Sequence, residues 1–128
     1  MTHKLFRVVL VLVAVVPFAL GCSSSEESGA PVGVPAAEQA KADGAVVLDV
    51  RSPEEFAAGH VAEATNLNFE SADFAPAVAD LDKGDTYVVY CRSGRRSALA
   101  AAQMAAAGLT VLDAGSLQNM VDAGYQLG

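Results

Sequence analysis

The sequence predicts a single α/β domain built on a parallel β-sheet. Short apolar runs rich in valine alternate with segments that favour helices, and this alternation is typical of a parallel sheet covered by helices. The chain has 128 residues, enough for one domain, and 52% of them are apolar, enough for a core. The formal net charge of −7 excludes general nucleic-acid binding, because that function needs a basic face.

The first half of the domain is expected to contain a short helix over residues 36–42, a strand over 45–50 and a helix that begins at Pro53. Residues 45–50 are apolar on both faces and partly β-branched, as in a buried parallel strand. The start of the second helix is well marked. Ser52 can cap it, Pro53 suits its first position, and Glu55 completes a capping box.

The second half continues the same alternation. Phe74, Val78 and Leu81 recur at helical spacing, provided that Pro76 lies in the first turns of the helix. Apolar runs and an alanine-rich segment define the other elements. The expected strands and helices are a strand at 65–68, a helix at 71–81, a strand at 86–90, a helix at 97–107, a strand at 109–112 and a helix at 117–123.

Residues 1–21 are expected to be a secretory signal. Lys4 and Arg7 precede thirteen uncharged, mostly apolar residues, 8–20. That run is too short to cross a bilayer as a helix, which takes about 20 residues, but it suits a signal peptide. The ending Gly21-Cys22 resembles the lipobox of bacterial lipoproteins, in which the cysteine is acylated and becomes the mature N-terminus. The alternatives are an ordinary signal peptide with an incidental cysteine, or an uncleaved anchor.

Residues 22–35 read as a flexible tether, because they are rich in serine, glycine, proline and glutamate. The lipobox resemblance implies a domain, 36–128, anchored by lipid on the extracytoplasmic side of the cell membrane. With Cys22 acylated, Cys91 would be the one remaining thiol and could not form an intramolecular disulfide.

Cys91 is the candidate catalytic residue, because it ends an apolar run and precedes a cationic turn and a helix. Backbone N–H groups of such a turn form an anion-binding nest, and arginines beside a helix N-terminus lower a thiol pKa. A thiolate there suits attack on a small anionic sulfur compound, and the same donors can stabilise a persulfide. The candidate substrate-binding residues are Arg92, Ser93, Gly94, Arg95, Arg96 and Ser97.

Three stretches of the sequence are similar to signatures of the rhodanese family, and together they cover residues 36–128. They are the front signature from Val47 to Leu67, the active-site loop Cys91–Ser97 and the tail signature from Gly115 to Tyr125. The resemblance implies a five-stranded parallel sheet flanked by helices. It implies no metal or organic cofactor, and the chain is expected to be a monomer.

The same resemblance implies sulfur transfer. Cys91 would take the sulfane sulfur of thiosulfate or a persulfide and pass it to cyanide or a thiol. Asp49 and Arg51, after the first strand, are expected to support the loops by hydrogen bonds. Three residues depart from the family pattern: Glu63 replaces a glycine, Ser116 replaces the second glycine of the tail, and Met120 replaces a tryptophan.

Alternative functions follow from the length of the loop. Related phosphatases and arsenate reductases have the spacing Cys-x5-Arg, whereas this chain has Cys-x4-Arg ending at Arg96, with Ser97 at the phosphatase arginine position. The smaller loop favours sulfur over phosphorus. A non-catalytic binding or sulfur-carrier module remains a second possibility. Arg92 and Arg95 are equally compatible with solvated surface charges.

Overall fold

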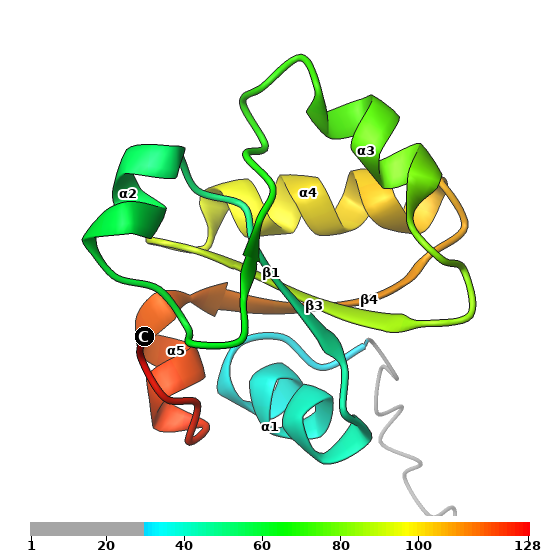
Figure 1. Cartoon of the computed structure of the whole chain (residues 1–128). Helices are drawn as coiled ribbons and strands as arrows, with labels where there is room; N and C mark the ends of the chain where they lie inside the picture. The colour runs from blue at the N-terminus through cyan, green and yellow to red at the C-terminus, as the bar shows by residue number, and fades with distance from the viewer. Residues whose placement is uncertain (1–29) are drawn as a thin grey trace, which may run out of the picture.

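The computed structural model describes residues 30–128; the expected signal peptide, Cys22 and the tether up to residue 29 lie outside the described residues. The described part is a three-layer α/β domain (Figure 1). Its helices are α1 (Val34–Asp43), α2 (Pro53–Ala58), α3 (Phe74–Asp80), α4 (Arg95–Ala106) and α5 (Leu117–Asp122). Its strands are β1 (Val46–Asp49), β2 (Thr65–Asn66), β3 (Thr86–Cys91) and β4 (Thr110–Ser116).

The sheet is parallel throughout, with the strand order β2-β1-β3-β4. The expectation of five strands is wrong for residues 30–128, which form four. At the free edge of β4, Val32 makes a single parallel bridge to Asp113. Pro31 before it lacks an N–H donor, and α1 begins at Val34, so the pairing cannot extend into a strand. α1 begins at Val34, before the expected start at residue 36.

The core has two halves, one on each face of the sheet. Figure 1 shows α1 and α5 on one face and α3 and α4 on the other. Side chains alternate along β3, so Val88 and Tyr90 join the cluster under α1 and α5, while Val89 and Cys91 join the cluster under α3 and α4. This alternation places the Cys91 thiol on the α4 face, at the carboxyl end of the central strand β3.

Two local sequence signals are confirmed by the structure. Ser52 and Glu55 form both hydrogen bonds of the capping box at the start of α2. Pro76 is the third residue of α3, where its missing N–H has no partner to lose. Two of the departures from the family pattern are also accommodated: the Ser116 side chain caps α5, and Met120 is fully buried in the core.

Candidate active site

Cys91 is the last residue of β3 and is fully buried. A short loop, residues 92–94, leads from it directly into α4. The Gly94 backbone N–H donates a hydrogen bond to Cys91 Sγ at 3.0 Å. Gly94 has φ of 98°, and a Cβ there would lie 3.5 Å from the Gly115 Cα of the neighbouring strand. The 3.5 Å separation is an ordinary contact, so it is the positive φ that favours glycine where the loop amide reaches the sulfur.

The electrostatic environment lowers the pKa of the Cys91 thiol below its ordinary value. Burial by itself raises this pKa, but hydrogen-bond donors around the sulfur outweigh it. The backbone N–H and hydroxyl of Ser97 lower the pKa most, followed by the backbone N–H groups of Gly94 and Ser93. The site therefore favours a thiolate, the reactive form of cysteine.

Ser97 also fixes the shape of the loop. Its side chain is fully buried, and its hydroxyl lies 3.0 Å from the Gly94 carbonyl and 3.1 Å from the Gly115 carbonyl, so its single hydrogen can be donated to either of them. These contacts connect the loop to the end of β4. The sequence pointed to Ser97 as a substrate-binding residue, and the structure adds this supporting position.

We expect Ser97→Ala to raise the pKa of Cys91, because the Ser97 hydroxyl is one of the groups that lower this pKa. Ser93→Ala is the matched control, since Ser93 acts through its backbone N–H, which alanine keeps. The measurement is the pH dependence of Cys91 alkylation by iodoacetamide. Equal titration midpoints for Ser97→Ala and the unmodified protein would contradict this role of the hydroxyl.

The three arginines of the loop region have different environments. Arg96 forms a bidentate salt bridge with Glu55, at 2.7 and 2.9 Å, and its guanidinium lies 3.9 Å from Glu70. Arg92 and Arg95 are exposed and form no salt bridge with any residue from 30 to 128. The guanidinium most available to an anionic substrate therefore belongs to Arg92 or Arg95, whereas Arg96 mainly joins α4 to α2.

The Glu55–Arg96 pair has a predictable pH dependence. Arg96 is the largest cause that lowers the pKa of Glu55 from 4.5 to about 2. Because the folded-state pKa is depressed, the pair contributes its full stability above about pH 4.5 and loses it as the pH falls toward 2. The Glu55 side chain is 28% exposed, so Glu55→Gln is expected to destabilise the protein by only about 1 kcal/mol at neutral pH.

Urea unfolding of Glu55→Gln between pH 7 and 3 measures this effect. The difference from the unmodified protein should shrink below about pH 4.5. Glu70→Gln is the control, because Glu70 is 65% exposed and lies farther from Arg96. A difference that stays constant down to pH 3 would show that Glu55 stabilises α2 without its charge.

Asp49 and Arg51 form a buried ion pair at the carboxyl end of β1. Arg51 Nε donates to both oxygens of Asp49 at 2.9 and 3.0 Å, and Nη2 donates to Oδ2 at 2.6 Å. Nη2 also donates to the Gly59 carbonyl, at 2.6 Å. The Tyr90 hydroxyl donates to Asp49 Oδ2 at 2.7 Å and accepts from the Val61 N–H at 3.0 Å. The network links the strand ends to the segment after α2.

The hydrogen bonds of Asp49 and Arg51 connect the end of β1 to Tyr90 and Gly59, and neither residue hydrogen-bonds to Cys91. Sequence reasoning missed two members of the supporting structure, Glu55 as partner of Arg96 and the Tyr90 hydroxyl as partner of Asp49. The sequence around Glu55 indicates only a helix cap, and the sequence around Tyr90 indicates only an apolar strand. Among residues 30–128, no group of three or more His, Cys, Asp or Glu side chains is placed to hold a metal ion.

A surface hollow of about 410 Å³ lies beside the loop. Its lining combines four polar or charged residues, Glu70, Ser93, Arg95 and Arg96, with two apolar ones, Phe69 and Leu99. Leu99 is 52% exposed, which leaves an apolar surface next to the cationic loop. A small anion or thiol could reach the loop through this hollow.

Known proteins of similar sequence point to one family. The model of the Rhodanese-like domain family matches residues 35–120. A thiosulfate sulfurtransferase GlpE of Pseudomonas putida is 44% identical over 93 residues, which cover 72% of this chain and 76% of the relative. The thiosulfate sulfurtransferase PspE of Escherichia coli (strain K12) is 38% identical over 74 residues, covering 57% and 71% of the two chains.

Solved structures share the fold. A rhodanese-related protein from Thermoplasma volcanium superposes with a TM-score of 0.65 at 26% identity, covering 78% of this chain and 98% of that one. A rhodanese with anions from E. coli superposes with a TM-score of 0.55 at 32% identity, covering 65% and 95%. On the match of the family model and of these relatives, the chain belongs to the rhodanese-like family.

Proposed function

We propose that this protein is a sulfurtransferase that takes the sulfane sulfur of thiosulfate or of a persulfide onto Cys91 and passes it to cyanide or a thiol. The observation that carries the proposal is the thiol at the end of β3, whose pKa is lowered by donors from Ser97, Gly94 and Ser93. The names of the relatives, thiosulfate sulfurtransferases at about 40% identity, support the same reaction class.

The first half-reaction is a substitution at sulfur. The Cys91 thiolate attacks the outer sulfur of thiosulfate, a new S–S bond forms, and the old S–S bond breaks with its electron pair leaving on sulfite. The resulting persulfide carries negative charge at neutral pH. The backbone N–H groups that favour the thiolate can also stabilise the negative charge of the persulfide. The loop holds them in position before the reaction begins, so no reorganisation is needed.

The second half-reaction returns the thiolate. A nucleophilic acceptor, cyanide or a thiolate, attacks the outer sulfur of the persulfide, and Cys91 departs as thiolate. The products are thiocyanate or the persulfide of the acceptor. Arg92 and Arg95 are the groups available to attract the anionic donor, and the hollow beside Phe69 and Leu99 offers the acceptor a path.

The test is incubation of the protein with thiosulfate and then with cyanide. We expect a mass increase of one sulfur at Cys91 after the first addition, and thiocyanate with return of the original mass after the second. A protein that gains no sulfur and forms no thiocyanate would be a binding module rather than an enzyme. Hydrolysis of an aryl phosphate would instead favour a phosphatase.

We further propose that the chain is a lipoprotein anchored at the extracytoplasmic face of the cell membrane through Cys22. The proposal rests on the sequence of residues 1–22. Within residues 30–128, none of the helices has the length and apolar character to cross a bilayer. Mass spectrometry of the native protein tests the anchor: the expected mature chain begins at Cys22 and carries acyl groups, and an unmodified Cys22 would overturn it.

A further inference from the structure

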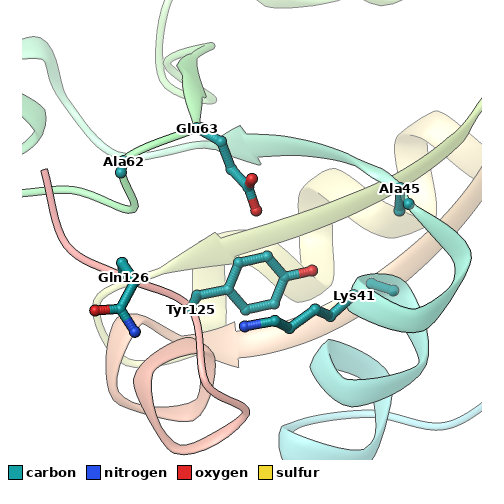
Figure 2. Close-up of a pocket in the computed structure, with 8 residues that line it drawn as sticks. Lys41, Ala45, Ala62, Glu63, Tyr125 and Gln126 are labelled. Carbon is teal, nitrogen blue, oxygen red and sulfur yellow. The ribbon is translucent and has the colours of Figure 1, made fainter.

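A second pocket lies at the opposite end of the parallel strands from Cys91. Its volume is about 290 Å³, and Figure 2 labels Lys41, Ala45, Ala62, Glu63, Tyr125 and Gln126 around it. Ala45 directly precedes β1, which runs parallel to β3, so the pocket is at the start of the strands and Cys91 at the end. Tyr125 belongs to the core under α1 and α5, whereas Cys91 belongs to the other half.

The pocket contains a buried polar group without a partner. Tyr125 is 4% exposed, and its hydroxyl makes no hydrogen bond; within residues 30–128, it is the one buried side-chain oxygen or nitrogen in this state. Figure 2 shows the hydroxyl directed toward Ala45, inside the set of lining residues. Because an unpaired buried hydroxyl is unfavourable, the pocket favours a ligand that supplies a hydrogen-bonding atom at this point.

Groups of opposite charge lie on two sides of Tyr125. Lys41 Nζ lies 5.1 Å from the centre of the Tyr125 ring and donates to the Gly124 carbonyl, and its other two N–H groups have no hydrogen bond to residues 30–128. Figure 2 shows the Glu63 carboxylate directed toward the ring. Glu63 forms no salt bridge within residues 30–128, and its charge, after burial, contributes to a raised pKa of Tyr125.

These groups set requirements on a ligand. A simple anion would be disfavoured by Glu63 and by the acidic chain, with its net charge of −7, and a simple cation would be disfavoured by Lys41. A molecule that carries both charges can satisfy both side chains and the hydroxyl. The other lining residues include three alanines, Ala40, Ala45 and Ala62, which leave room for a short aliphatic group, and Gln126, which adds a polar side chain.

We propose that this pocket binds a small zwitterion of the α-amino acid type. Its carboxylate would lie toward Lys41 and the Tyr125 hydroxyl, its ammonium toward Glu63, and its aliphatic group against the alanines. Glu63 is one of the three departures of this sequence from the usual rhodanese signature, so the acidic side of the pocket is a property of this chain. The pocket is independent of the sulfur chemistry at Cys91.

The test is titration of the full chain with three matched probes, followed by the NMR shifts of the Ala45 and Ala62 amides. L-valine carries both charges, isovalerate lacks the ammonium, and isobutylamine lacks the carboxylate. We expect saturable shifts at millimolar L-valine and much weaker shifts with the other two. Equal binding of all three probes, or no shift with L-valine, would overturn the proposal.

Two variants assign the contacts. Tyr125→Phe should weaken L-valine binding about fivefold, the effect of one lost hydrogen bond. Glu63→Gln should remove the preference for L-valine over isovalerate. Tyr87→Phe is the matched control, because the Tyr87 hydroxyl donates to the Asp82 carbonyl away from the pocket. Unchanged affinity in Tyr125→Phe, or an unchanged preference in Glu63→Gln, would contradict the assigned contacts.

Discussion

Replacement of Cys91 by serine is expected to reduce thiocyanate formation by on the order of 10⁴-fold or more, because the hydroxyl is a far weaker nucleophile than a thiolate. The variant should also gain no sulfur from thiosulfate. Serine is similar in size and can accept the same hydrogen bond from the Gly94 N–H, so the fold and the loop should persist. The measurements are steady-state thiocyanate production and the mass of the protein after exposure to thiosulfate.

The control for this prediction is Ser93→Ala, which changes the same loop but leaves the thiol and every backbone N–H in place. It should retain most of the activity and the full gain of sulfur. The urea midpoint of Cys91→Ser should be close to that of the unmodified protein. Thiocyanate production by Cys91→Ser at a rate comparable to the unmodified protein would place the transferred sulfur elsewhere and contradict the proposed reaction.

The nucleophile could be predicted from sequence because the signals around it are local. An apolar run that ends at Cys91, Gly94 within the turn and an alanine-rich helix after it specify a strand, a loop and a helix in order. Local geometry then brings the Ser93 and Gly94 amides to the sulfur. The parallel sheet follows in the same way, since alternation of short strands and helices leaves few other topologies.

Pairings between distant segments could not be predicted. Glu55 and Arg96 are 41 residues apart, and each has a sufficient local explanation, Glu55 in a capping box and Arg96 in an anion-binding loop. The Tyr90 hydroxyl likewise reaches Asp49 across 41 residues. The expected fifth strand is absent from residues 30–128 for a local reason, because the chain enters α1 directly after the single bridge at Val32. A resemblance to a family predicts the usual number of strands and cannot predict such a local difference.

The largest effect on stability is expected at Asp49. Asp49→Asn removes the negative charge from a site in which both Asp49 and Arg51 are buried, 0% and 5% exposed. It leaves the Arg51 guanidinium buried without a counter-charge, and removal of one partner from such a pair typically destabilises a protein by about 3–5 kcal/mol. Urea unfolding followed by circular dichroism measures the effect, with a lower midpoint and an unchanged slope expected.

The control for size and amide chemistry is Asp122→Asn. Asp122 is exposed, and within residues 30–128 its side chain hydrogen-bonds only to Gln118. Its unfolding free energy should change by less than about 0.5 kcal/mol. If Asp49→Asn changed the unfolding free energy as little as Asp122→Asn does, water would reach Arg51 and the pair would not be buried in solution.

A second replacement separates the charge of Arg51 from its packing. In Asp49→Asn combined with Arg51→Met, the buried charge is gone, and the double variant should be more stable than Asp49→Asn alone. The Gly59 carbonyl would lose its donor, so recovery should be incomplete. If the double variant is instead less stable than the single one, Arg51 stabilises the segment after α2 mainly through Gly59, and Asp49 serves chiefly to orient it.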